Sequence, residues 1–317
     1  MHQSTRFLLC VLSGLLLTGL ATVSTPANAQ DCDRACLAGF LDQYLNALVA
    51  NDASQAPLSY GFRQTENSVV TPNDEGLWST VTGLRALQRR YFDPAGSTAG
   101  FFGVLDEDGE PAIVALRLKI TNQMITEAEW HIGREQDVGI TGEPGGVVFD
   151  LDNLMANPPN EGFVPLDRRY SRDDLIAVAN SYFDGIIAKN SKVIKGHPGC
   201  ARWENGFPTF GGELAPGATG FEGKSDCRTA GDFGLAQITA RRVQVVDVEQ
   251  QIVMMSVVFL RQPGNERWRN HFTHTISIED GLIRQVHGAM FYAPPTQPVP
   301  NWPPYDGNFP LSFDTAE

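Results

Sequence analysis

The sequence predicts an α+β protein made of two similar halves. The dipeptide Glu-Asn begins at Glu66 and again at Glu204, and a tyrosine lies 22 residues before each glutamate, at Tyr44 and at Tyr182. Each half also places one helix-forming stretch before a group of strand-like runs joined by short turns. Because the helix and the strands are segregated rather than alternating, we expect two mainly antiparallel sheets, each with a helix packed on it.

The first 29 residues have the pattern of a secretory signal peptide. Arg6 supplies a positive charge, residues 7–23 are mainly apolar, and Ala27-Asn28-Ala29 fits the small-x-small cleavage pattern. We therefore expect a mature protein in the periplasm of a Gram-negative bacterium or outside the cell. An uncleaved membrane anchor is the alternative, but polar and glycine residues interrupt the apolar run and no basic residues follow it.

The charge and the missing motifs exclude several classes of function. The net charge of the 317-residue chain is −13, and it becomes −14 once Arg6 leaves with the signal peptide. Such an acidic protein is a poor partner for nucleic acids or anionic lipids. After the signal peptide no stretch approaches the roughly 20 apolar residues of a membrane span. No phosphate-binding loop, serine nucleophile elbow, zinc-protease helix or dinucleotide fingerprint occurs, so we predict no cofactor.

Four cysteines follow the signal peptide, and an even number fits disulfide bonds in an oxidising compartment. Each half holds two, so the simplest pairing is Cys32–Cys36 and Cys200–Cys227. The second bond would close a loop rich in glycine and proline, which is worth about 3 kcal/mol in the loop-entropy model. A redox role for the first pair is the alternative, but the spacing is not Cys-x-x-Cys.

The first domain is assigned to residues 30–137. Its predicted elements are a helix at 35–51, a connector at 57–62, an extended segment at 62–70, a helical stretch at 77–91, and strands at 101–105, 113–120 and 124–132. Residues 106–109 and 122–123 are turn sequences of the kind that join antiparallel strands.

Glycine and proline then dominate residues 138–170, which we interpret as a linker. Ser171 is the expected N-cap of the next helix, and it opens a second domain at residues 171–292. Its predicted elements are a helix at 173–189, an extended segment around 202–205, and strands at 236–247, 251–260, 271–278 and 282–292. Asp280-Gly281 predicts a hairpin turn. Residues 293–317 form a Pro-rich tail, expected to drape over a domain surface or to fray.

This organisation resembles the nuclear transport factor 2-like (NTF2-like) superfamily, which includes SnoaL-like polyketide cyclases, ketosteroid isomerases and scytalone dehydratases. The resemblance covers residues 33–135 and again 172–292, and it implies two tandem cone-shaped α+β barrels of the cystatin/NTF2-like kind, each with an apolar pocket. The segments Tyr-Phe-Asp-Gly-Ile (182–186) and Arg-x-Glu-Asn-Gly (202–206) further resemble a family of secreted bacterial and fungal proteins of unknown activity. No motif here aligns with the catalytic residues of the isomerases.

Glu204 is the first candidate for chemistry in such a pocket. Desolvation raises the pKa of a carboxyl group in an apolar pocket, which suits a general base near neutral pH. Arg202 would share a strand face with it, holding the carboxylate ionised and orienting a carbonyl-bearing or anionic ligand, and Tyr182 would polarise a substrate oxygen. The alternative is that Glu204-Asn205 caps the junction of helix and sheet, which the recurrence at Glu66 favours.

Histidines are concentrated in the second half. His287 occupies the position of Glu129 when the matched turns are aligned, and it is expected to face the pocket as an acid–base group, with an outward or core position as the alternative. His271 and His274 lie three apart on one strand, so their side chains leave opposite faces and make a poor pair of metal ligands. Glu127, Glu129 and His131 alternate on one strand face of the first half, which we interpret as a solvated edge, with a second site as the alternative.

Three functions remain for the mature protein. The first is a cofactor-independent lyase, isomerase or hydratase acting on a small hydrophobic or carbonyl-bearing molecule. Its base would be Glu204 or His287, and Arg202 or Tyr182 would polarise the substrate oxygen. The second is a non-catalytic module that binds a small apolar ligand. The third is a structural protein whose two domains pack on each other. In each case we expect the second domain to carry any site.

Overall fold

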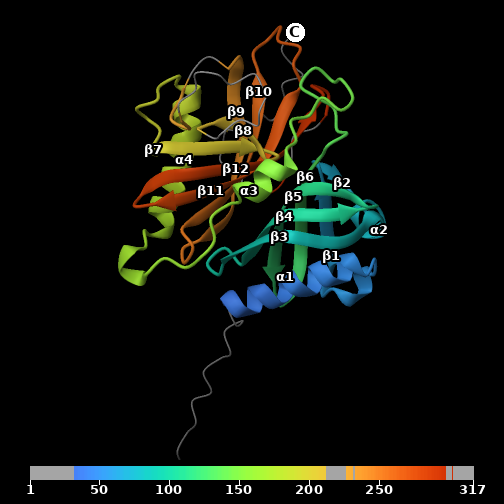
Figure 1. Cartoon of the computed structure of the whole chain (residues 1–317). Helices are drawn as coiled ribbons and strands as arrows, with labels where there is room; N and C mark the ends of the chain where they lie inside the picture. Colours follow the sequence, from blue (N-terminus) through green and yellow to red (C-terminus); the bar gives the residue numbers. More distant parts are fainter. Residues whose placement is uncertain (1–31, 212–225, 231–232, 298–301, 303–317) are drawn as a thin grey trace, which may run out of the picture. The chain divides into compact units, whose positions relative to one another are not determined.

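Two sheets with the same strand order build the protein (Figure 1). The computed structural model describes residues 32–211, 226–230, 233–297 and 302. In these residues the first sheet has the order β2-β1-β6-β5-β4-β3 and the second the order β8-β7-β12-β11-β10-β9. In each sheet the first strand pairs in parallel with the last one, β1 with β6 and β7 with β12, whereas the other pairs are antiparallel. The expected duplication and the α+β class are thus confirmed.

Both long helices and most of the predicted strands occur where the sequence predicted them. The first half contains α1 (Arg34–Val49), η1 (Ala53–Gln55), β1 (Leu58–Glu66), β2 (Val69–Val70), α2 (Leu77–Thr80), β3 (Val81–Asp93), β4 (Thr98–Glu107), β5 (Glu110–Thr121) and β6 (Met124–Arg134). Next come α3 (Leu151–Ala156) and η2 (Leu166–Arg168). The second half contains α4 (Arg172–Ile187), β7 (Gly196–Glu204), β8 (Phe207–Phe210), β9 (Leu235–Asp247), β10 (Ile252–Arg261), β11 (Arg269–Glu279) and β12 (Leu282–Ala293).

Each long helix packs on one face of its own sheet. The side chain of Asp33 caps α1, and the predicted Ser171 caps α4 by accepting from the backbone N–H of Asp174. Apolar side chains of α1 join those of β4, β5 and β6 in one core, and α4 does the same with β10, β11 and β12. These helix-covered faces are called the inner faces below.

The other faces of the two sheets pack against each other. Phe102 and Val104 of β4 belong to one apolar cluster with Val245 of β9 and Met254 of β10. Gly100 makes this approach possible, because a Cβ atom there would lie 2.3 Å from the sulfur of Met254. Both faces of each sheet are covered, and strands β4 and β10 are accordingly apolar almost throughout. Strands β6 and β11 instead carry buried polar side chains, among them Glu129 and His274.

One predicted helix is wrong: most of residues 77–91 belong to strand β3, and only Leu77–Thr80 is helical. Leu84 pairs with Leu105, whereas Gln88 pairs with Gly103, so the register of β3 against β4 shifts between these two positions. A bulge of this kind spoils the alternation of a strand and places apolar residues three or four apart, which mimics a helix. The expected connector at 57–62 is likewise mostly part of β1.

Both predicted disulfide bonds are present. Cys32 bonds to Cys36 and Cys200 to Cys227, with Cα–Cα distances of 5.2 and 5.3 Å. Such bonds are typical of proteins that fold in oxidising compartments. The expected signal peptide and residues 212–225 inside the second disulfide loop lie outside the described residues, as does most of the tail.

Trp302 is the one described residue beyond 297, and it is buried. Its indole N–H donates to the hydroxyl of Thr65 over 3.1 Å, and the guanidinium groups of Arg63 and Arg117 lie 4.2 and 5.3 Å from its ring. At this point the tail packs on the first sheet.

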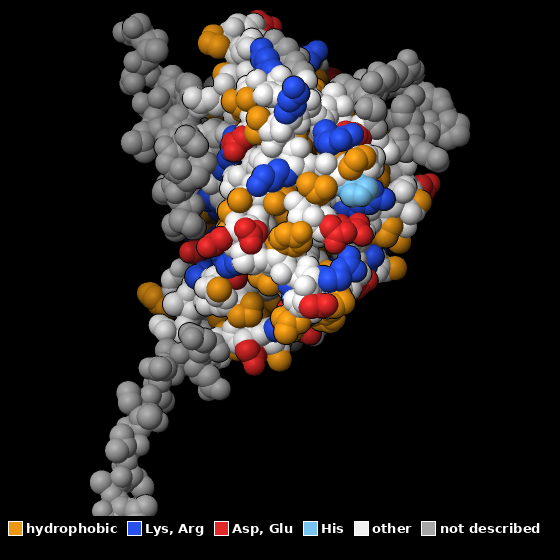
Figure 2. All heavy atoms as spheres, turned by 90° about the vertical axis from the view of Figure 1, so that its left-hand side faces the viewer, with side chains coloured by type: hydrophobic (Ala, Val, Ile, Leu, Met, Phe, Trp, Pro, Cys, Tyr) orange, Lys and Arg blue, Asp and Glu red, His pale blue; other side chains and the backbone are white. Residues whose placement is uncertain are grey.

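The described surface mixes both signs of charge. On the face that Figure 2 shows, Lys and Arg side chains are interspersed with Asp and Glu side chains and with apolar ones. In the part of the chain that the structure describes, no helix is both long and apolar enough to cross a membrane.

Candidate functional site

The Arg-x-Glu-Asn-Gly segment forms the end of β7 and the turn into β8. Asn205 and Gly206 both have positive φ values, 43° and 80°, which is the backbone of a tight hairpin turn. The Asn205 side chain accepts from the backbone N–H of Met290 and donates to its carbonyl, each over 2.9 Å. A Cβ atom on Gly206 would lie 2.0 Å from the carbonyl oxygen of Asp150. Asn205 and Gly206 are therefore explained by the fold.

An asparagine in the first half makes the same two backbone hydrogen bonds. Asn67 has a φ of 49° and exchanges two hydrogen bonds with the backbone of Ile132, over 3.0 and 2.8 Å. The carboxylate of Glu66 accepts from the N–H of Leu77 over 2.9 Å, which is the loop-capping role considered for the Glu-Asn pair. The described partner of Glu204 is instead Arg202. The two asparagines are equivalent. The two glutamates share one contact, because Glu66 also accepts from Gln64 over 2.9 Å, but Glu66 alone has a described backbone donor.

Arg202, Glu204 and Tyr182 converge on the inner face of the second sheet. Arg202 and Glu204 form an ion pair, as their alternation on β7 predicted, and Arg202 also donates to the hydroxyl of Thr209 over 3.0 Å. Only 4% of Arg202 is exposed. Burial lowers the pKa of its guanidinium, but the Glu204 carboxylate outweighs this and leaves the pKa above its ordinary value. Arg202 is thus a buried cation beside a carboxylate whose side chain is 12% exposed.

His274 completes this group. Its Nε2 lies 3.3 Å from Nη2 of Arg202, and because arginine can only donate, Nε2 must accept. Burial first, and Arg202 second, hold the pKa of His274 well below its usual value, so the ring is neutral and carries its proton on Nδ1. The ring centroids of His274 and Tyr182 lie 6.4 Å apart. Burial raises the pKa of Tyr182 to about 12, so its hydroxyl keeps its proton.

Three polar atoms of this group lack hydrogen-bond partners among the described residues: the hydroxyl of Tyr182, Nδ1 of His274 and Nε of Arg202. The side chains of Tyr182 and His274 are completely buried, and Arg202 is 4% exposed. Unsatisfied polar groups in a protein interior are costly and uncommon. All three atoms are donors, so an oxygen acceptor is the kind of partner that each of them lacks.

In the first sheet, the equivalent polar side chains have hydrogen-bond partners within the protein. The hydroxyl of Tyr44, which corresponds to Tyr182, donates to Gln64 over 2.6 Å and accepts from the indole of Trp130 over 3.1 Å. Gln64 occupies the position of Arg202 and also accepts from Trp78 over 2.9 Å. In the second half Gly288 stands at the sheet position of Trp130, because it pairs with Glu204 as Trp130 pairs with Glu66.

His287 does not face this interior. It lies on the opposite face of β12, stacked on Trp203 with ring centroids 4.4 Å apart and packed edge-on against Phe102 of the first sheet at 6.1 Å. Burial, with a smaller effect of Arg89, lowers its pKa to about 3. The expected pocket-facing position of His287 is therefore corrected to a core position between the sheets, away from the group formed by Arg202.

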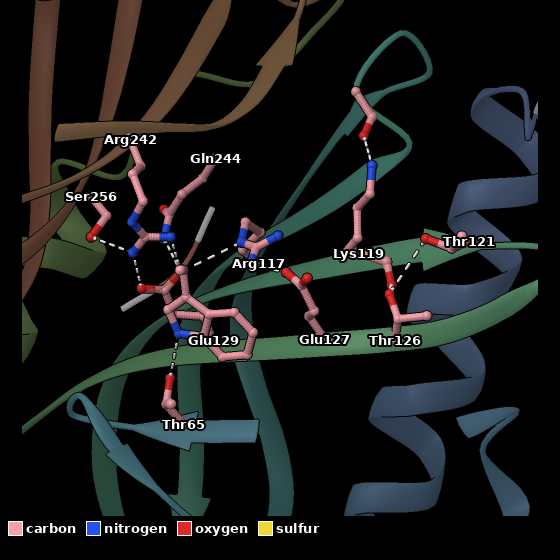
Figure 3. A network of polar contacts seen from close by, with 12 residues as sticks. Thr65, Arg117, Lys119, Thr121, Thr126, Glu127, Glu129, Arg242, Gln244 and Ser256 are labelled. Carbon is pink, nitrogen blue, oxygen red and sulfur yellow. Dashed lines mark hydrogen bonds and ion pairs between the residues drawn. The ribbon is translucent and has the colours of Figure 1, made fainter. Parts of the chain in front are cut away.

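The acidic strand face of the first half is also placed differently from its prediction (Figure 3). Glu129 is 1% exposed rather than solvated, because the second sheet covers it. Two nitrogens of Arg242 and the side chain of Gln244, all from β9, bind its carboxylate, as does Arg117 from its own sheet. His131 is equally buried and contacts Thr273 over 2.9 Å. This network joins the two sheets.

Sequence analysis missed His274 and Thr209 as members of the interior group. The signal for His274 was its alternation with Phe272 and Ile276, two apolar residues that belong on the inner face. Within the described residues, no group of three or more His, Cys, Asp or Glu side chains is arranged to hold a metal ion.

The comparisons with known proteins give a domain family and a structure. Residues 168–290 match a family model described as a domain of unknown function (DUF8021). A crystal structure of an NTF2-like protein of unknown function from Cytophaga hutchinsonii is similar at 10% sequence identity and a TM-score of 0.26, over 31% of this chain and 89% of that chain. No curated protein matches this chain. The family match spans α4 to β12, which includes the whole interior group.

Proposed function

We propose that the second half binds a small, largely apolar molecule with a carbonyl or carboxylate oxygen on the inner face of its sheet. The observation that carries this proposal is the contrast between two equivalent tyrosines. Tyr44 has two hydrogen-bond partners, whereas Tyr182 has none in the described chain. Apolar surroundings with a few convergent polar groups are typical of small-molecule sites. In this proposal both halves are NTF2-like domains, and only the second keeps a ligand.

The catalytic form of the proposal makes the protein a cofactor-independent lyase, isomerase or hydratase. Tyr182 and the Nδ1 proton of His274 would bind the substrate oxygen, where negative charge grows when a proton next to a carbonyl is removed. Glu204 would remove that proton, and Arg202 would keep the carboxylate charged and oriented. The alternative is a binding module with the same contacts and no proton transfer. In both forms of the proposal, the protein acts outside the cytoplasm after residues 1–29 have been removed.

A matched pair of substitutions tests the binding site. Tyr182→Phe removes a hydroxyl without a described partner, so we expect the melting temperature to change little and ligand binding to be lost. Tyr44→Phe leaves the indole N–H of Trp130 without its acceptor and leaves Gln64 with the donor Trp78 alone, so we expect it to cost about 1–3 kcal/mol of stability and to leave binding intact. Thermal shift with a panel of small hydrophobic ketones and carboxylic acids, together with native mass spectrometry of co-purified molecules, measures the binding. If Tyr182→Phe binds these compounds as tightly as the wild type, the proposal is wrong.

A second measurement separates the enzyme from the binding module. A ketone that binds is incubated with the protein in D2O, and exchange of its α-protons is followed by NMR. Exchange that Glu204→Gln abolishes, while binding persists, supports the catalytic form. A bound ketone without exchange supports the binding module.

A further inference from the structure

A cleft of about 430 Å³ lies where the first and second sheets meet, on the faces that are not covered by α1 and α4. Four basic residues line it, whereas its lining contains two carboxylates, Asp93 and Glu127. The basic residues come from both halves of the chain and are Arg117, Lys119, Arg172 and Arg242. Such a basic cleft is unexpected in a chain with a net charge of −13.

Three of the four cations have carboxylate partners. Arg172 lies 2.8 Å from Asp93, Arg117 lies 2.5 Å from Glu127, and Arg242 binds Glu129, which lies behind the cleft. Figure 3 shows these last two pairs together with Lys119.

Lys119 is the fourth cation. Its ammonium group donates to the carbonyl of Gly96 over 2.6 Å, and no ion pair within 4.0 Å is recorded for it in the part of the chain that the structure describes. Burial, followed by the nearby charge of Arg117, lowers its pKa. Counting Glu129, the cleft thus has four cations and three carboxylates, and the remaining positive charge belongs to Lys119.

Two buried donors in the same lining also lack described partners. These are the hydroxyl of Thr98, in a residue that is 6% exposed, and Nε of Arg242, in a residue that is 3% exposed. Thr98 is the direct strand neighbour of Lys119, because β4 and β5 pair in that register. The lining of the cleft therefore contains one cation without an ion-pair partner and two donors without described hydrogen-bond partners, and an anion with oxygen acceptors suits such a lining.

We propose that this cleft binds a small oxyanion, the carboxylate or phosphate group of a small molecule, with Lys119 as its charge partner and Thr98 and Arg242 as hydrogen-bond donors. The volume lies in the range of small-molecule sites. The site is separate from the interior group around Arg202, since it lies on the opposite side of the second sheet. A ligand here contacts both halves, so it also stabilises the packing of one sheet on the other.

Isothermal titration calorimetry of the mature protein at low ionic strength tests the site. The probes are inorganic phosphate and succinate, with sodium chloride at matched ionic strength as the blank. Saturable binding of phosphate alone identifies a phosphate head group, and binding of succinate alone identifies a carboxylate. Lys119→Gln should weaken the binding at least tenfold and Thr98→Val several-fold, because each removes one contact.

Lys192→Gln is the matched control, since it removes the same charge from an exposed position outside this cleft. It should leave the affinity within twofold of the wild type. Thermal unfolding without the anion establishes that each variant is folded, and Thr98→Val gives an independent measurement if Lys119→Gln is not. The proposal is overturned if neither anion binds saturably. It is also overturned if the control weakens binding as much as the two cleft variants do.

Discussion

Replacing Glu129 with Gln should destabilise the protein strongly, because this carboxylate joins the two sheets. In the wild type, Nη1 of Arg242 donates to it over 2.9 Å and Gln244 donates over 3.1 Å, and both come from the other sheet. The neutral amide keeps the shape of the side chain but leaves the guanidinium of Arg242 buried without a counter-charge. Breaking a buried ion pair by removing one partner costs about 3–5 kcal/mol.

The same substitution should change how stability depends on pH. Burial raises the pKa of Glu129, but the charges of Arg242 and Arg117 outweigh this and hold the pKa at about 2, against an ordinary value of 4.5. Because the folded pKa lies below the unfolded one, the stabilisation is present above about pH 4.5 and is lost as the pH falls towards 2. The difference between the two pKa values is worth about 3 kcal/mol.

Urea denaturation of residues 30–317 from pH 7 to pH 3 measures both effects. Relative to the wild type, Glu129→Gln should lose several kcal/mol at pH 7, and this deficit should shrink as the pH falls below 4.5. Glu127→Gln on the same strand is the control, because its pair with Arg117 is partly exposed and should cost at most about 1 kcal/mol. Equal effects of the two substitutions at pH 7, or a deficit that does not change with pH, would refute the role assigned to Glu129.

Three other substitutions test the fold. His287→Leu should leave the free energy of unfolding at pH 7 nearly unchanged and should reduce the loss of stability below pH 6.5. The reason is that the buried ring has a pKa of about 3 in the folded protein, so the unfolded chain takes up the proton first as the pH falls. A pH series of urea titrations checks this. Asn205→Ala should cost about 2–4 kcal/mol in the same titration, because two backbone groups of Met290 lose their partners. Replacing Cys200 and Cys227 with Ser should cost about 3 kcal/mol by calorimetry, and peptide mapping without reduction should find the two wild-type cysteines joined, whereas free thiols would contradict the bond.

The order of the elements could be predicted because each strand and helix has a local signal. Turn dipeptides such as Asp280-Gly281 set the hairpins, and the spacing of apolar residues identified both long helices. Strand β3 was misassigned because the bulge between Leu84 and Gln88 breaks the alternation on which a strand prediction depends. The signal was lost through a local irregularity that only the pairing with β4 explains.

The packing of one sheet on the other could not be predicted from either half. An alternating run such as Glu127, Glu129 and His131 fits a strand with one face in water, and nothing near it in the sequence indicates a cover. The cover comes from β9, more than one hundred residues later, where Arg242 supplies the opposite charge. His287 was misplaced for another reason. It is adjacent to Val286, whose side chain belongs to the inner-face core, so on strand β12 the two side chains leave opposite faces.

The duplication is most informative where the two halves keep a residue type and change its partners. Asn67 and Asn205 keep both the residue and its contacts, so they serve the fold. Tyr44 and Tyr182 keep the residue, but the first is held by Gln64 and Trp130, whereas the second has Arg202 and Gly288 at those positions. Had only the fold constrained Tyr182, a phenylalanine would fill the same space without burying an unsatisfied hydroxyl.

The contrast between these tyrosines therefore favours a ligand in the second half over a purely structural protein. The extensive contact between the sheets is fully compatible with this view, because the contact uses the outer faces and leaves the inner faces to the helices. The first inner face is closed by Trp78 and Trp130, whose indoles complete the hydrogen bonds of Gln64 and Tyr44. On the second inner face, the donors of Tyr182 and His274 have no acceptor among the described residues. The oxygen of a small molecule is the simplest group that supplies one.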